Sequence, residues 1–417
     1  MNIRENRVEG GLILIEVKKL KNGIPIFIDR MEDIKSFTMG IFIKTGARHE
    51  TEGEYGISHF IEHMLFKGSK KYSAKELSEL IDDNGGSINA YTSKDTTCYY
   101  VKMLSSKMDI AFDVFSEMIM NSTFSEENIE KERNVILEEI KMYLDIPEEV
   151  VHDENMKFVL SDEYGNSILG TEESLKKIDR DKMLEYFLDR YTPDNMGISI
   201  AGNVDSIMEK LESTFGTIPK RKSKNSIVSK FKIKNGENLI KKECNQVHLC
   251  LNTLGLKVLD EKKYALAILS NVLGENMSSR LFQKIREERG LAYSIYSYTT
   301  SYLEGGLFTI YAGTSKESYR EVIELIKKEF QDIKTNSIEE KELERGKNQL
   351  KSMLIFGLEN SRGKMARMWN SYQLYGKIIS IDEIEEMISK ISLIDIKELA
   401  NEIFDESKYS ITILGEI

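Results

Sequence analysis

The sequence predicts an α+β fold of two homologous domains, each a mainly antiparallel sheet packed by helices. Three observations support this prediction. Strand patterns and amphipathic helix patterns alternate along the first half of the chain. The second half repeats part of that order. A basic stretch without acids lies near the midpoint of the chain, where a linker between two domains would fall.

The first half contains the clearest individual elements. Asn22-Gly23 is a typical hairpin turn, and it separates the apolar runs Val17–Lys21 and Ile24–Asp29. Asn84-Gly85-Gly86 is a second turn. Period-two patterns predict strands over Ser36–Lys44, Ser87–Ser93, Thr96–Leu104 and Gly197–Ala201. Helical patterns cover Tyr55–Phe66, Ser73–Asp83, Lys107–Met120, Ser125–Leu144 and Val204–Phe215.

An internal repeat links the two halves. A shift of 209 positions places Gly46 on Gly255 and superposes strand, loop and helix without a gap. Under this shift His59, Glu62 and His63 meet Ile268, Asn271 and Val272. The polar triad is therefore expected in one domain only.

The predicted domains span residues 1–222 and 223–417. The basic segment Pro219–Lys234, rich in Ser, Asn and Lys, is interpreted as the linker between them. An anion-binding patch is the alternative, and we prefer the linker because runs of like charge are usually solvated.

Composition narrows the class of protein. Hydrophobic residues make up 41% and charged residues 30% of 417 residues, as in ordinary globular proteins. The net charge of -11 argues against nucleic acid as the main partner. No apolar run is long enough to cross a membrane, and Met1–Val17 lacks the features of a secretory or transit leader. Cys98, Cys244 and Cys250 lack metal-type spacing, and free thiols indicate a reducing compartment, so we expect a cytoplasmic location.

The strongest chemical signal is the segment His59-Phe60-Ile61-Glu62-His63. Two histidines at i and i+4 stack on one side of a helix, close enough to share one metal ion. The apolar residues of the same helix form a stripe on the opposite face, and these are Ile57, Phe60, Ile61, Met64 and Leu65. The histidines are therefore not core residues, and neutral imidazoles suit zinc. Glu62 is placed to act as the general base.

A zinc site needs a third protein ligand, usually a carboxylate in this setting. Glu132 and Glu139 lie two helical turns apart, both within the apolar arc predicted for Ser125–Leu144. Members of that arc are Ile129, Val135, Ile136, Ile140, Met142 and Tyr143. Buried carboxylates need a partner, which is either a basic side chain or a metal. The wheel places Glu138 on the far side and leaves the choice between Glu132 and Glu139 open.

These motifs resemble the pitrilysin/insulinase superfamily of zinc peptidases with the inverted motif H-x-x-E-H. The resemblance rests on residues 59–63, on Gly85–Ser93 and on Glu132–Glu139. It is strongest for the beta subunit of mitochondrial processing peptidase and its single-chain bacterial relatives. In that family the third ligand follows the second histidine at about the distance seen here, 139 − 63 = 76. The resemblance thus implies Glu139 as ligand.

Further roles are implied by the resemblance alone. It implies that the acid at Glu132 assists catalysis, and that Arg286 and Tyr293 of the second domain bind substrate and stabilise the transition state. It implies one Zn²⁺ per chain. It also implies pairing of two chains around a peptide: a homodimer is expected, and a heterodimer with an inactive homologue is the alternative.

The expected activity is that of a zinc endopeptidase acting on short, extended or unfolded peptides. Ser87–Ser93 would be an edge strand to which a peptide can add as a further strand. Phe66, Asn89, Ala90 and Tyr91 are the expected substrate contacts. A plain sheet strand is the other interpretation of this segment. The rival function is a non-catalytic homologue that acts as a scaffold or partner subunit, although such relatives usually lose ligand residues.

Overall fold

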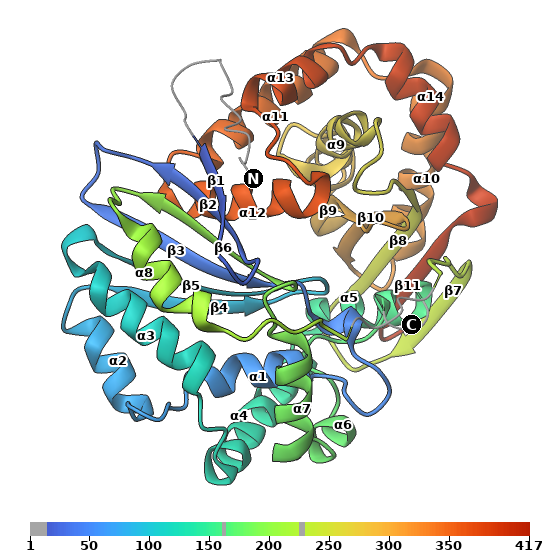
Figure 1. The fold of residues 1–417 in the computed structure, drawn as a ribbon. Helices are drawn as coiled ribbons and strands as arrows, with labels where there is room; N and C mark the ends of the chain where they lie inside the picture. The colour runs from blue at the N-terminus through green and yellow to red at the C-terminus, as the bar shows by residue number, and fades with distance from the viewer. Residues whose placement is uncertain (1–14, 161–163, 225–229) are drawn as a thin grey trace. The chain divides into compact units, whose positions relative to one another are not determined.

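The computed structural model describes residues 15–160, 164–224 and 230–417 of the chain (Figure 1). Most of Met1–Val17 lies outside these residues, as does the centre of the basic segment Pro219–Lys234. No helix in the described ranges has the length and apolar character needed to cross a membrane.

The described chain forms two compact units, which are not two continuous halves. Unit 1 comprises residues 15–141, 166–224 and 357–380, and unit 2 comprises the remaining ones. One helix of each half is therefore part of the other unit. The division predicted at residues 222 and 223 lies close to the third change of unit, and a single cut there places each of these two helices in the wrong unit.

Unit 1 is built on a six-stranded sheet of order β1-β2-β6-β3-β5-β4. Its strands are β1 (Ile15–Lys19), β2 (Pro25–Arg30), β3 (Ser36–Ile43), β4 (Ser87–Thr92), β5 (Thr97–Leu104) and β6 (Met196–Gly202). β2 and β6 pair in parallel, and the other neighbours pair antiparallel. The β1–β2 hairpin confirms the turn predicted at Asn22-Gly23, where Gly23 takes φ +108°. β4 lies at one edge of the sheet.

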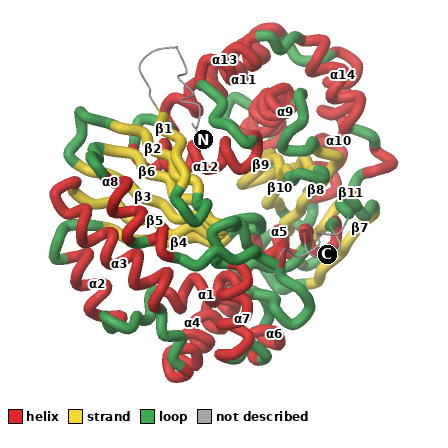
Figure 2. The backbone as a smooth tube through the Cα atoms, in the orientation of Figure 1, coloured by secondary structure: helices red, strands yellow, loops and turns green. Residues whose placement is uncertain are grey.

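Helices cover both faces of this sheet (Figures 1 and 2). One face packs against helices of the first half of the chain, which are α1 (Ile57–Leu65), α2 (Ala74–Asp82), α3 (Met108–Asn121), α4 (Glu126–Leu144), α7 (Arg180–Arg190) and α8 (Ile207–Ser213). The other face packs against α12 (Ser361–Tyr375), whose Trp369 stacks on Phe42 with ring centroids 5.0 Å apart. The strands are therefore buried from both sides.

Unit 2 repeats this architecture. Its sheet has the order β7-β11-β8-β10-β9. The strands are β7 (Gly236–Lys241), β8 (Val247–Gly255), β9 (Ala292–Ser301), β10 (Gly306–Thr314) and β11 (Ser410–Gly415). Only β7 and β11 pair in parallel. Strand order and direction match those of β2-β6-β3-β5-β4, so the predicted repeat and the α+β class with two homologous domains are confirmed.

Helices also cover both faces of the second sheet. One core lies beneath α9 (Lys263–Ser270), α10 (Tyr319–Asn336), α11 (Glu340–Gly357) and α14 (Leu393–Ile403). The other face packs against α5 (Pro147–Val159), which comes from the first half of the chain. There His152 of α5 bonds to the Tyr296 and Tyr298 hydroxyls of β9, both at 2.9 Å.

The apolar arc predicted for α4 is wrong in part. Ile129 and Ile136 are buried, but Val135, Met142 and Tyr143 are exposed. Leu137 and Ile140 still pack against the core of unit 1, Val135 lies on the exposed side of the helix, and Met142 and Tyr143 follow residue 141, where the unit ends. A helical wheel assumes one environment along the whole length of a helix, and α4 has two.

Candidate metal centre

Helix α1 is held at its start by a buried carboxylate. Glu50 accepts hydrogen bonds from the backbone N–H groups of Gly56 at 2.7 Å and Ser58 at 2.9 Å. These are among the N–H groups that a helix start leaves without partners. Gly56, at φ +90°, occupies a backbone conformation that favours glycine. Burial raises the pKa of Glu50 to about 7, against the effect of the two hydrogen bonds.

The predicted apolar stripe of α1 is buried, and the polar triad lies on the other face. His59, His63 and Glu139 of α4 come together there. Glu139 Oε2 lies 3.9 Å from His59 Nε2 and 3.8 Å from His63 Nε2. One ligand atom from each of the three residues lies within 4.8 Å of the others, and no other such group of His, Cys, Asp or Glu occurs among the described residues.

These distances fit a metal better than a hydrogen bond. At 3.8–3.9 Å the carboxylate is too far from either ring nitrogen for a hydrogen bond. Ligand atoms about 2.0–2.2 Å from a tetrahedral ion lie roughly 3.3–3.6 Å apart. The two distances from Glu139 exceed this spacing by only a few tenths of an ångström, so its carboxylate lies close to the position of a ligand. Two imidazoles and one carboxylate are also a donor set that zinc takes in hydrolases.

The electrostatics of His59 favour its role as a ligand. Burial, with a smaller effect of neighbouring His63, lowers the pKa of His59 to about 3. Its imidazole is therefore neutral at neutral pH, which is the form that binds metals. The two rings lie 4.6 Å apart between centroids. Both side chains are mostly buried, with 13% and 19% exposed, whereas 35% of the Glu139 side chain is exposed.

Glu62 lies beside this cluster and bonds to the edge strand. Its Oε2 accepts a hydrogen bond from the Thr92 hydroxyl at the end of β4. Burial raises the pKa of Glu62, and the Thr92 hydrogen bond opposes that change. A carboxylate with a raised pKa is a better proton acceptor near neutral pH, as a general base requires.

Glu132 is buried behind His63. Its Oε2 lies 3.1 Å from His63 Nδ1, and its Oε1 lies 2.7 Å from Lys67 Nζ. Of the two partners suggested by its buried position, Glu132 has the basic side chain, and it contacts a histidine of the cluster instead of belonging to the ligand group itself. Glu138, by contrast, is exposed and pairs with Lys141 at 2.7 Å.

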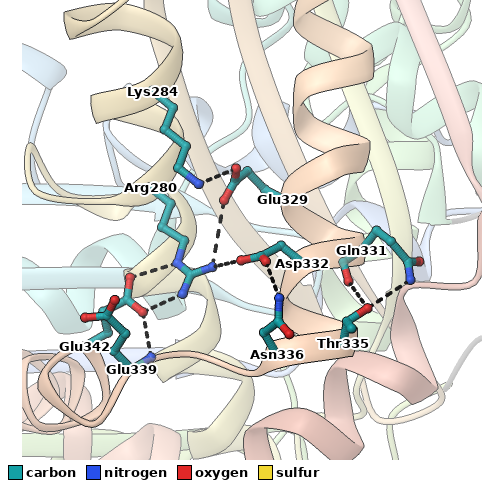
Figure 3. Close-up of polar contacts among 9 residues, drawn as sticks. All are labelled: Arg280, Lys284, Glu329, Gln331, Asp332, Thr335, Asn336, Glu339 and Glu342. Atoms are coloured by element: carbon teal, nitrogen blue, oxygen red, sulfur yellow. Dashed lines mark hydrogen bonds and ion pairs between the residues drawn. The ribbon is translucent and has the colours of Figure 1, made fainter.

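Arg286 and Tyr293 lie together on unit 2. Tyr293 is at the start of β9 and 73% exposed. The Arg286 guanidinium lies over the Tyr293 ring, 5.6 Å from its centroid. Arg286 belongs to a π-helical turn, Phe282–Glu287. Figure 3 shows how this segment is anchored: Arg280 reaches Glu342 of α11 and Asp332 of α10.

The predicted substrate contacts lie on or near the edge strand. In β4, Asn89 and Tyr91 point outward, and Ala90 between them is partly buried. The Ala90 N–H donates to the Asn89 side-chain oxygen at 2.8 Å. Phe66 follows the last residue of α1 and packs partly against the core of unit 1. Their contact with a substrate stays a prediction.

Four residues at this site escaped the sequence interpretation: Glu50, Lys67, Thr92 and the buried Arg133. Lys67 follows His63 by four residues, so helical spacing could have indicated it. Thr92 lies near the end of a predicted strand, and nothing in the surrounding sequence indicates a function for it. Glu50 and Arg133 gave no signal, because their partners are backbone groups supplied by the fold.

The fold and the histidine–glutamate cluster together define a two-domain zinc peptidase scaffold. Comparison with known families agrees. The family described as "Insulinase (Peptidase family M16)" matches residues 27–172, and the one described as "Peptidase M16 inactive domain" matches residues 177–350. The chain therefore belongs to peptidase family M16, the pitrilysin/insulinase group.

Relatives extend over nearly the whole chain. The "uncharacterized zinc protease YmxG" of Bacillus subtilis is 42% identical over 95% of this chain and 97% of its own length. An "uncharacterized zinc protease" of Rickettsia bellii is 37% identical over the same shares of the two chains. A protease from Helicobacter pylori with a crystal structure shares the fold, with a TM-score of 0.88 over 97% of this chain and 100% of its own, at 22% identity.

Proposed function

We propose that this protein is a zinc-dependent endopeptidase that cleaves short, extended or unfolded peptides, with one zinc ion per chain. The observation that carries the proposal is the convergence of His59, His63 and Glu139 with Glu62 beside them. These residues would hold the ion and supply the base. The relatives are named zinc proteases, which supports both the metal and the protease activity.

Zinc, when bound, supplies a Lewis acid that activates water and polarises a carbonyl. The chain's own contribution begins with Glu62, whose carboxylate accepts the proton of the attacking water and returns it to the leaving amine. The Thr92 hydroxyl holds one Glu62 oxygen, which leaves the other free to take the proton. Glu132 would assist by orienting His63.

Arg286 and Tyr293 are proposed to donate hydrogen bonds to the carbonyl oxygen as negative charge develops on it. Their support is the contact between the guanidinium and the ring and the exposure of Tyr293, which leaves its hydroxyl open to a ligand. Both side chains are donors at neutral pH.

The peptide is proposed to add to β4 as a further antiparallel or parallel strand. β4 is an edge strand, and its Ala90 N–H donates to the adjacent Asn89 side chain. A substrate carbonyl could replace that side-chain oxygen. Main-chain pairing gives affinity with little choice of sequence, which suits extended peptides. Phe66 and Tyr91 would then contact substrate side chains.

The experiment that tests this function compares Glu62→Gln with the wild type in zinc content and in cleavage of an unfolded peptide. We expect the variant to keep zinc, because Glu62 is not a ligand, and to lose cleavage by about 10²–10⁴-fold, the usual contribution of a general base. Wild-type protein that binds no zinc at stoichiometric level would refute the catalytic assignment and favour the scaffold alternative.

Assembly and location complete the proposal. One chain carries both the zinc set and the Arg286–Tyr293 pair, so a homodimer is proposed ahead of a heterodimer with an inactive homologue. The cysteines Cys98, Cys244 and Cys250 are free thiols, which supports a reducing compartment such as the cytoplasm. The expectation that this chain resembles the beta subunit of mitochondrial processing peptidase more than other members of the family stays a prediction.

A further inference from the structure

Three side chains form a continuous polar chain behind the candidate metal centre. Lys67 Nζ lies 2.7 Å from Glu132 Oε1, and Glu132 Oε2 lies 3.1 Å from His63 Nδ1. The Glu132 side chain is buried, with 6% exposed. A carboxylate buried in this way needs polar partners, and the ammonium attracts it because opposite charges interact strongly at this distance.

The contact between Glu132 and His63 Nδ1 determines how the His63 ring is used. A carboxylate oxygen can only accept a hydrogen bond, so Nδ1 of His63 must carry the proton. Its Nε2 then keeps a free lone pair, and this atom is the one that lies 3.8 Å from Glu139. A carboxylate behind a ligating imidazole fixes both the tautomer and the ring orientation.

Lys67 is itself held in place by α4. Its backbone carbonyl accepts a hydrogen bond from the Asn128 side chain at 2.8 Å, one turn before Glu132 on the same helix. The next residue, Arg133, is buried and donates to the Ile178 carbonyl at 2.8 Å. The Lys67–Glu132 contact is therefore part of a fixed junction between the end of α1 and α4, unlike a mobile surface ion pair.

The two histidines differ in this respect. His59 Nδ1 is buried without a hydrogen-bond partner among the described residues, whereas His63 Nδ1 faces Glu132. Only one of the two imidazoles is thus oriented from behind. The contact with Glu132 restricts rotation of the His63 ring. His63 lies near the end of α1, four residues before Lys67.

We propose that Lys67 is a positioning residue of the zinc site. Its ammonium holds the Glu132 carboxylate in place, and through Glu132 it orients the His63 ring with Nδ1–H towards the carboxylate. The inference rests on the proposed zinc function and adds a residue to it.

The test uses full-length Lys67→Met and Lys67→Arg, with Lys131→Met as the matched control. Lys131 lies on the same helix as Glu132 and pairs with Glu127 at 2.6 Å, but both side chains are largely exposed. The zinc dissociation constant is measured by competition with a chelator. The tautomer of His63 is measured in metal-free protein by long-range ¹H–¹⁵N correlation, which is practical because the chain has only five histidines.

We expect Lys67→Met to weaken zinc binding about tenfold, at the lower end of the range for residues behind a ligand, and to mix the His63 tautomers. Lys67→Arg, which keeps the charge, and Lys131→Met should behave like the wild type. In a Glu132→Gln background, Lys67→Met should add little further loss.

Two results would overturn the inference. Equal zinc affinity and an unchanged His63 tautomer in Lys67→Met and Lys131→Met would show that Lys67 does not act on the site. A loss in Lys67→Arg as large as in Lys67→Met would show that its charge is not the cause. If wild-type protein binds zinc and cleaves peptide, either result leaves the proposed function intact. A wild type without zinc binding would remove both.

Discussion

The same helix pair serves different purposes in the two units. In unit 1, α1 and α4 place His59 and His63 opposite Glu139. In unit 2, the corresponding positions of α9 and the turn after it are the buried Ile268, Asn271 and Val272. There α11 approaches α9 so closely that a Cβ on Gly346 would lie 2.8 Å from Ile268 Cγ2. In unit 2 the two helices approach each other closely, whereas in unit 1 the polar side chains of the candidate site lie between them.

The treatment of charge also differs between the units. With the shift of 209 positions, Lys71 corresponds to Arg280, and both pair with acids on the helix that follows β5 or β10 (280 − 209 = 71). The Lys71 side chain is 52% exposed, and its ammonium pairs with one acid among the described residues, Asp113. Arg280 is 12% exposed and reaches three acids, Glu329, Asp332 and Glu342 (Figure 3). Its pKa is raised, chiefly by the Glu342 hydrogen bonds.

This difference separates a structural charge cluster from a functional one. The buried acids of unit 2 have basic partners within the chain, so they need no ligand. Glu139 of unit 1 faces two imidazoles, of which His59 is neutral at neutral pH, at distances too long for hydrogen bonds. The candidate site is therefore distinguished by a carboxylate that is incompletely paired beside a polar helix face, and not by the presence of charge alone. Three predictions test this difference between the two units.

The largest effect is expected at the third ligand. Glu139→Ala should lower zinc affinity by more than the roughly 10–100-fold that changes behind the ligands cost, because one of three donor groups is lost. Glu138→Ala, one residue away and paired with Lys141 on the surface, is the control and should leave zinc content unchanged. Metal analysis after dialysis checks both. The reverse outcome would refute the assignment of Glu139.

A smaller effect, on stability, is expected in unit 2. Arg280→Met should reduce the free energy of unfolding by about 3–5 kcal/mol, since it leaves buried acids without their main partner. The counterpart change in unit 1, Lys71→Met, should leave the free energy of unfolding almost unchanged, because that pair is exposed. Urea denaturation of the two variants measures the difference. Similar losses would contradict the distinction between the two units.

The smallest effect concerns pH and the start of α1. Glu50 has a folded-state pKa of about 7 against an ordinary 4.5, so the folded protein retains a proton that the unfolded chain has lost between these values. The stabilising contribution is complete below pH 4.5 and is lost as pH rises through 7. With about 1.4 kcal/mol per pKa unit, the change is at most about 3 kcal/mol.

Urea denaturation of wild type and Glu50→Gln between pH 4.5 and 8 checks this expectation. Glutamine does not titrate, so the stability of the wild type relative to the variant should fall as pH rises. A rise instead would mean that the hydrogen bonds from Gly56 and Ser58 outweigh burial and lower the pKa of Glu50.

Much of the site could be predicted because it lies on two amphipathic helices. The stripe of α1 assigns His59, Glu62 and His63 to the face away from the core, and period alone is sufficient for that. The same reasoning failed over part of α4, where Val135, Met142 and Tyr143 are exposed. It could not choose between Glu132 and Glu139 either, since both lie on one side of the helix, and spacing in a known family was needed.

The order of elements, the repeat and the residue types of the candidate metal ligands could be predicted from the sequence, because helix and strand periods are local properties. Tertiary structure decided what lies next to each of them. It placed Lys67 and His63 on either side of Glu132, Thr92 against Glu62, and Glu50 at the start of α1. Such contacts depend on how helices and strands pack, and no local pattern encodes them. The polar triad could thus be predicted from the sequence, whereas the residues that orient it could be identified only from the tertiary structure.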